Sequence, residues 1–249
     1  MRAWPRRFAA AAFVAAAGLA GLAVRAQEAV DAAAPFGPPV DDDRVYMHAL
    51  LDEFEGRFDG GTDPALRWEG EAWVGTDTNR LWFKSEGQVL DGQVRDGDQE
   101  LLYARPLSAY FDLQAGVRYD LDSVPGRGWA AFGVEGLTPY FFNVSATAYA
   151  SDGGHFAARV QASWDLLLTQ RLILQPEVEL NAYSKVDPAR DVGSGVSNLE
   201  AGLRLRYEIS RKFAPYAGVV YERVRGPDPA EGYGSGGTWR LSAGLRTWW

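Results

Sequence analysis

The stretch AYFDLQAGVRYDL at residues 109–121 alternates strictly between apolar and polar side chains. Every second residue from Ala109 to Leu121 is apolar or aromatic, whereas the residues between them include Asp112, Arg118 and Asp120. Successive side chains of a β-strand point to opposite faces. The stretch therefore predicts a strand with one apolar face and one charged face.

The same period of two recurs along the rest of the chain, with Gly, Asp or Pro between the segments. It predicts twelve strands, at about 45–58, 66–76, 80–90, 98–105, 109–121, 128–137, 140–150, 155–168, 171–184, 197–210, 213–225 and 237–249. A soluble sandwich or a lipocalin-like barrel also alternates, but it turns its apolar face inward and uses strands of about 5 to 6 residues. Most of these segments are long enough to cross a membrane at a tilt.

Charge and aromatic placement also favour a membrane barrel. One face of nearly every segment carries charges of both signs, as a polar lumen requires. Aromatic residues such as Trp82, Trp239 and Trp249 gather near segment ends, where their rings suit the membrane interfaces. We therefore expect an all-β fold: a closed, antiparallel, up-and-down transmembrane β-barrel of about twelve strands.

The connections alternate in length. Those near 77, 106, 138, 169 and 211 are tight, whereas those near 59, 122, 185 and 226 are longer. Bacterial barrels have short periplasmic turns and longer extracellular loops. This alternation predicts an even strand count with both chain ends in the periplasm.

The N-terminus predicts export. Residues 1–26, MRAWPRRFAAAAFVAAAGLAGLAVRA, place arginines ahead of an apolar run that ends on short side chains, as in a cleaved secretory signal peptide. A retained anchor is the alternative. Residues 27–44 are rich in Ala, Pro and Asp and predict a disordered periplasmic tail. The barrel then occupies 45–249, and the expected location is the outer membrane of a Gram-negative cell.

Composition excludes some partners. Removing residues 1–26 takes away four arginines and no acid, so the formal charge of -8 becomes -12. An acidic protein is a poor partner for nucleic acid and a good one for cations. The chain has no cysteine, so it needs no disulfide and offers no thiolate metal site.

Several stretches go beyond a generic barrel pattern, above all DLLLTQRLILQPEVELNAYSK at 165–185 and GSGVSNLEAGLRLRYEISRKFAPYAGV at 193–219, followed by YERV at 221–224. With NRLWFKSEG at 79–87 and LLYARP at 101–106, they resemble the copper resistance protein B family across essentially the whole barrel. The resemblance implies an outer-membrane barrel that binds copper and sequesters or exports it. It also implies a periplasmic multicopper oxidase as partner.

The chain departs from that family in its soft ligands. Members often carry a Met- and His-rich segment ahead of the barrel, whereas this chain has two Met and two His in all. Met47 and His48 form its one soft-ligand pair, near Asp41, Asp42 and Asp43. Adjacent strand residues face opposite ways, so the pair needs a bulge or a free end to chelate one ion. Ordinary strand-start residues are the alternative, and we expect at most one or two copper ions per chain.

The expected inner face is dense in charge. Its carboxylates form a possible cation path, made of Glu53, Glu55, Glu69, Glu71, Glu177, Glu179, Glu200 and Glu222. An internal ion-pair network is the alternative, and the two overlap, because paired charges can also form a constriction.

Other functions fit the sequence less well. A phospholipase needs a serine beside a base. His155 is the better candidate base of the two histidines, but the alternation places it on the inner face, and no serine is evident as its partner. We therefore expect no enzymatic activity. A general small-solute channel without copper specificity is the alternative function.

Overall fold

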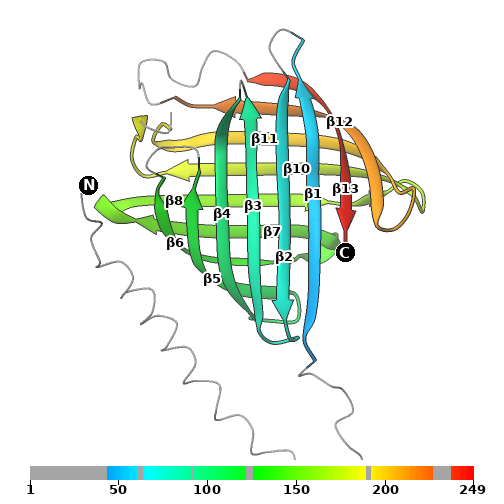
Figure 1. Ribbon diagram of the computed structural model, residues 1–249, viewed down its shortest axis with the longest axis horizontal. Helices are drawn as coiled ribbons and strands as arrows, with labels where there is room; N and C mark the ends of the chain where they lie inside the picture. Colours follow the sequence, from blue (N-terminus) through cyan, green and yellow to red (C-terminus); the bar gives the residue numbers. More distant parts are fainter. Residues whose placement is uncertain (1–43, 61–63, 91, 122–125, 189–191, 227–236) are drawn as a thin grey trace, which may run out of the picture. The chain divides into compact units, whose positions relative to one another are not determined.

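The computed structural model describes residues 44–60, 64–90, 92–121, 126–188, 192–226 and 237–249. The predicted signal peptide and almost all of the predicted tail lie outside these residues. The described residues form an antiparallel sheet that closes on itself (Figure 1). Its strands are β1 (Tyr46–Phe58), β2 (Ala65–Gly75), β3 (Arg80–Leu90), β4 (Gln93–Pro106), β5 (Phe111–Asp120), β6 (Gly128–Leu137), β7 (Phe142–Ser151), β8 (His155–Trp164), β9 (Leu166–Leu167), β10 (Leu172–Tyr183), β11 (Gly195–Tyr207), β12 (Phe213–Val224) and β13 (Thr238–Trp248).

The thirteen labelled segments make a barrel of twelve strands, because β8 and β9 are one strand with an interruption. Both pair with β10 in the same register, Ser163 opposite Glu177 and Leu166 opposite Leu174. The interruption therefore falls opposite Pro176, which has no N–H to donate to a neighbouring strand. The predicted closed barrel of twelve antiparallel strands is confirmed.

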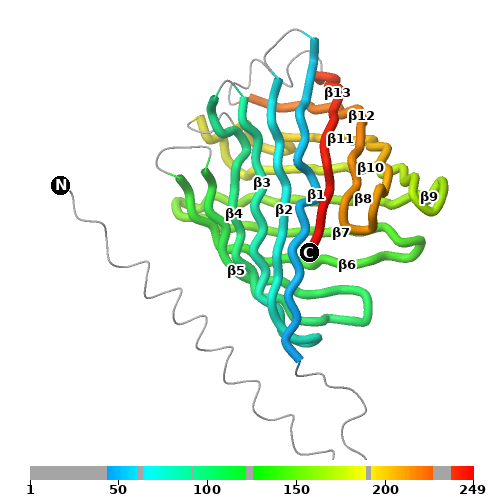
Figure 2. Tube along the Cα trace, turned by 45° about the vertical axis from the view of Figure 1, so that its right-hand side comes forward, coloured from blue at the N-terminus to red at the C-terminus, as the bar shows by residue number. Residues whose placement is uncertain are grey.

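The barrel closes between its first and last strands. β1 pairs with β13, with Leu50 opposite Trp248 and Phe58 opposite Leu241. Figure 2 shows β13, in red, running along β1, in blue. Closure leaves no unpaired sheet edge. A barrel in lipid needs this closure, because no water is present there to form hydrogen bonds with free backbone groups.

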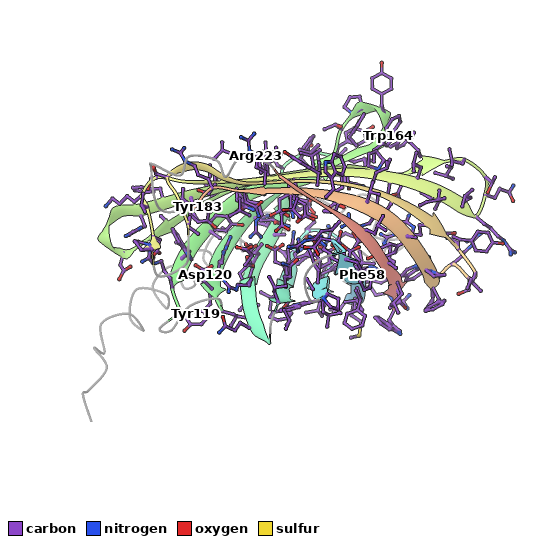
Figure 3. The ribbon with its side chains drawn as sticks, turned by 90° about the horizontal axis from the view of Figure 1, so that it is seen from above. Phe58, Tyr119, Asp120, Trp164, Tyr183 and Arg223 are labelled. Carbon is purple, nitrogen blue, oxygen red and sulfur yellow. The ribbon has the colours of Figure 1, made fainter. Side chains whose placement is uncertain are left out.

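The two faces separate as the alternation predicts. Val117 and Tyr119 of β5 are both 50% exposed on the outside, whereas Arg118 and Asp120 are buried inside. Viewed from above, side chains with nitrogen and oxygen atoms fill the space between the two walls (Figure 3). The interior is thus largely polar.

A β-bulge in β1 changes the phase of that strand. Leu51 pairs with Gly70, but Glu53 pairs with Glu69, so β1 carries one extra residue at this point. The pairing of β1 with β13 shifts in the same interval. Asp52 and Glu53 therefore both turn inward, because a bulge sets two residues against one.

The expected start of the fourth strand is wrong by several residues. The sequence DGQVRDG at 91–97 reads as a break, but β4 begins at Gln93, directly after the short connection 91–92. Glu86 of β3 lies opposite Asp98, but Gln88 lies opposite Arg95. The register therefore shifts between these pairs and leaves an extra residue on β4 at Asp96–Gly97. Asp96 has a φ of 48° there. The turn-forming residues thus mark a bulge as well as a turn.

The two ends of the barrel differ. One, here called the turn end, carries Tyr46, Trp248 and the connections 76–79, 107–110, 138–141, 168–171 and 208–212. The 3₁₀ turn η3 (Pro139–Phe141) belongs to it. The opposite loop end carries 59–64, 91–92, 121–127, 152–154, 184–194 and 225–237, with η4 (Asp152–Gly154) among them. Among the described residues, no helix is long and apolar enough to cross a membrane.

Candidate functional site: the charged lumen

Two arginines on the inner face tie β1 to β11. The guanidinium of Arg57 donates to both carboxylate oxygens of Glu200, at 2.6 and 2.9 Å, and to Glu55 at 2.7 Å. Arg204 contacts Glu55 at 3.1 Å and Glu177 at 2.9 Å, and it also pairs with Glu53. Arg57 and Glu55 are each 1% exposed. A buried charge of this kind is tolerated only when it is paired and hydrogen-bonded.

The strand period and the bulge explain this cluster. Arg57, Glu55 and Glu53 lie two residues apart on β1, so they share the inner face. Arg204 and Glu200 share the inner face of β11. The hairpin β12–β13 lies between these strands in the sheet, so the side chains meet by reaching across the lumen.

A second cluster surrounds Arg118 and Arg159. Arg118 pairs with Asp98 at 3.0 Å and with Asp120 at 2.8 Å, and Trp129 Nε1 donates to Asp120 at 2.6 Å. Arg159 Nη2 reaches Asp98 at 2.7 Å and Glu86 at 2.5 Å. The expected internal ion-pair network is therefore present in both halves of the lumen.

Part of the inner wall is apolar. Six buried side chains pack together on β3, β4, β6 and β7, namely Trp82, Leu102, Ala104, Trp129, Ala131 and Tyr149. The prediction that Trp82 lies at the membrane interface is wrong, since this ring faces inward and is 8% exposed. Tyr149 links the patch to the charges, because its hydroxyl donates to Glu100 at 2.6 Å.

A cavity of about 150 Å³ lies beside these clusters, and its lining is acidic. Its two basic residues are Lys84 and Arg159, and its eight acidic residues are Asp52, Glu69, Glu71, Glu86, Asp98, Glu100, Glu135 and Glu177. Lys84 pairs with Glu135 and lies 3.9 Å from Glu71. Acids outnumber bases eight to two in this lining, and four of the acids also pair with arginines outside it, so the lining favours cations over anions but is partly neutralised.

The structure brings three of the predicted path residues together. Carboxylate oxygens of Glu53, Glu69 and Glu177 lie within 4.8 Å of one another. Glu53 also contacts Arg67 at 3.2 Å, and Arg67 lies 3.4 Å from Glu69. Arginine thus offsets part of this negative charge.

The other predicted path residues are spread along the lumen. Glu71 lines the acidic cavity. Glu179 accepts hydrogen bonds from Gln161 at 3.2 Å and from Asn181 at 2.5 Å. Glu200 belongs to the Arg57 cluster, and Glu222 pairs with Arg240 at 3.4 Å toward the loop end. The eight carboxylates therefore belong to several clusters in the lumen and do not form a single site.

Met47 and His48 lie at the start of β1 but on opposite faces. Met47 is 83% exposed, and its cross-strand partner Val74 is exposed on the outside too. The ring of His48 lies 6.3 Å from that of Trp73 and 5.6 Å from that of Trp248. Trp73 packs against the inner apolar patch, which places His48 at the inner rim of the turn end. Asp41, Asp42 and Asp43 lie outside the described residues.

Five carboxylates of the acidic cavity are absent from the predicted path: Asp52, Glu86, Asp98, Glu100 and Glu135. Asp52 pairs with Arg246, and it faces inward only because of the bulge. Asp98 and Glu100 share their face with Leu102 and Ala104, and Glu135 shares its face with Trp129 and Ala131. Apolar residues inside the lumen blur the alternation that identifies the inner face elsewhere.

A closed barrel with an apolar outer surface and an ion-paired interior defines a class, the outer-membrane β-barrel proteins. A sequence profile described as "Copper resistance protein B precursor (CopB)" matches residues 45–249. The chain belongs to the copper resistance protein B family, as the resemblance predicts.

Two relatives carry that family name. "Copper resistance protein B" of Escherichia coli is 41% identical over 190 residues, which cover 76% of this chain and 64% of that protein. "Copper resistance protein B homolog" of Pseudomonas syringae pv. tomato (strain ATCC BAA-871 / DC3000) is 40% identical over 222 residues, covering 85% of this chain and 73% of that protein. The chain is thus similar to just under two thirds of the length of the E. coli protein.

Solved structures similar to this chain include porins. The NanC porin has a TM-score of 0.49 and 12% identity, and the match covers 80% of this chain and 97% of that one. The KdgM porin has a TM-score of 0.44 and 9% identity, over 80% of this chain and 98% of that one.

Proposed function

We propose that this protein binds copper along its charged lumen and helps to sequester or export it across the outer membrane, without catalysing a reaction. The observation that carries the proposal is the extent of the family match, which spans residues 45–249 and so coincides with the barrel. This match supports assigning the proposed copper role to the barrel.

The lumen chemistry supports transit more than storage. Cu(I) prefers thioether and thiolate ligands, and imidazole suits copper generally, whereas carboxylate oxygens bind copper less selectively. Most of the charged side chains that line the cavity are carboxylates, and the residues that form it include no Met, Cys or His. Weak, repeated carboxylate contacts let an ion enter and also leave.

The proposal includes an orientation. Residues 1–26 act as a cleaved signal peptide, residues 27–44 as a periplasmic tail, and residues 45–249 as the barrel. The turn end then faces the periplasm, because short turns of such barrels lie on that side. His48, at the inner rim of this end, is the first imidazole that a periplasmic copper ion meets. Met47 contributes separately, from the outer face. A periplasmic multicopper oxidase is the proposed partner.

Copper isotherms of the purified, signal-processed protein test the proposal. The wild type should bind one or two ions. The Glu69→Gln/Glu177→Gln variant should bind copper about tenfold more weakly, which corresponds to about 1.4 kcal/mol. His48→Ala should lose the tightest component. Asp112→Asn is the matched control, since Asp112 pairs with Arg80 at 2.7 Å and belongs neither to the predicted path nor to the lining of the acidic cavity, so its loss should leave the isotherm unchanged.

Other outcomes point elsewhere. Identical isotherms for the wild type, the double variant and His48→Ala would remove the lumen and its rim as copper ligands. If the protein bound no copper and admitted sugars and amino acids in liposome-swelling assays, a general small-solute channel would be the better description.

A further inference from the structure

The lumen holds a second cavity, separated from the first by a wall of charged side chains. The second cavity measures about 30 Å³ and includes Arg118, Tyr183 and Val192 in its lining, toward the loop end. The first cavity extends toward the turn end, where Asn143 and Ser163 line it next to the ends of β7 and β8. Two of the charged residues, Glu86 and Arg159, line both cavities, so they stand between them.

Arg159 spans the lumen at this wall. It extends from β8 and contacts Glu86 on β3 and Asp98 on β4, at 2.5 and 2.7 Å. On its own side of the lumen Arg159 also contacts the neighbouring strand β10. Its Nε donates to Asn181 at 3.1 Å and lies 3.7 Å from Glu179. Four strands separate β3 from β8 in the sheet, so these contacts join opposite walls.

A second arginine completes the wall. Arg67 on β2 lies 3.6 Å from Glu179 on β10, another contact across the lumen. It lines the second cavity together with Glu86 and Arg159. Arg159 differs from Arg67 in that it also faces the acidic first cavity.

We propose that Arg159 closes the lumen by occupying, as a tethered cation, the carboxylate positions that a permeating cation must use. A cation drawn into the acidic cavity reaches Glu86 and Asp98 and finds the guanidinium already bound to them. Passage then requires displacement of this side chain. Because arginine keeps its charge at every physiological pH, the guanidinium itself stays a cation and cannot release the carboxylates by losing a proton.

This inference deepens the proposed function, since it assumes a lumen that carries cations. Its test uses potassium and no copper, so its failure is distinct from a failure of copper binding. The single-channel conductance of the purified protein in planar bilayers is measured in KCl. The wild type should be closed or nearly so, and Arg159→Gln should conduct at least about tenfold more, the effect of removing about 1.4 kcal/mol of barrier. Its reversal potential in a KCl gradient should show selectivity for potassium.

Two further variants complete the experiment. Arg206→Gln is the matched control, because Arg206 is also buried and pairs with Asp165 at 2.8 Å, but it lines neither of these two cavities. It should conduct as the wild type does. Arg159→Lys keeps the charge but loses the planar fork, so it should conduct at a level between the wild type and Arg159→Gln.

The folded state of each variant is checked by the heat-dependent mobility of the barrel on gels. If Arg159→Gln does not fold, Arg159→Lys decides the question. Wild-type conductance in every folded Arg159 variant would overturn the proposal, as would a wild type that already conducts like Arg159→Gln.

Discussion

Arg204 shows how much a single inner side chain holds together. Its guanidinium contacts Glu53 and Glu55 on β1 and Glu177 on β10, two strands that are far apart in the sequence, and its side chain is 2% exposed. Removing one partner of a buried ion pair leaves the other charges uncompensated, which costs more than the pair contributes.

Arg204→Met should therefore lower the free energy of unfolding by about 3 to 5 kcal/mol. Urea unfolding in lipid vesicles, followed by tryptophan fluorescence, measures the change. Arg105→Met is the control, because Arg105 is exposed and its loss should change stability by less than about 0.5 kcal/mol. Equal stability of the two variants would mean that the network contributes little.

At the scale of the strand, the seam between β1 and β13 depends on a close approach of two backbones. Gly244 lies opposite Glu55, and a Cβ atom at Gly244 would lie 2.5 Å from the carbonyl oxygen of Phe54 and 2.6 Å from the Cβ of Glu55. Neither atom is the end of a flexible side chain, so strand β1 itself would have to move.

Gly244→Ala should destabilise the barrel by about 1 to 3 kcal/mol, the usual range for inserting a methyl group where no space exists. Gly128→Ala is the matched control, since no atom lies within 4 Å of the Cβ position there. The measurement is the fraction of each variant that resists unfolding by detergent at rising temperature. An equal loss of heat resistance in the two variants would show that the flexibility of glycine matters and that the close contact between β1 and β13 does not.

The strands also show what a sequence can predict. The inner and outer faces of β5, β10 and β11 follow from alternation alone, because most inward positions there are polar or glycine, and a lone apolar residue such as Ile173 does not hide the pattern. The bulge at Asp52 depends on how β1 pairs with two partners at once, which no local pattern encodes. The inner patch with Trp82 and Trp129 inverts the pattern, so Asp98, Glu100 and Glu135 were missed.

At the scale of the whole molecule, the two ends of the barrel should face different compartments. The absence of cysteine makes this testable with single introduced thiols. Asp152→Cys places an exposed thiol at the loop end, and Asp77→Cys places one at the turn end. A maleimide too large for porins should label intact cells at position 152 and not at position 77.

Permeabilised cells are the control, since both thiols should then react. Labelling of position 77 on intact cells would reverse the orientation and, with it, the proposed entry of copper at His48.

The contacts of Arg57 and Arg204 across the lumen have a kinetic consequence. They join β1 to β11, so they form only when the final hairpin β12–β13 has met β1. Until then Arg57 and Arg204 keep only their contacts within one strand or to a neighbouring strand, such as those to Glu55 and Glu177, and their remaining donors must stay hydrated. The ion pairs between β1 and β11 and the closure of the sheet should therefore form in one late event during insertion. Once complete, this event must be reversed as a whole before any single strand can leave, so the barrel should be long-lived even where its equilibrium stability is modest.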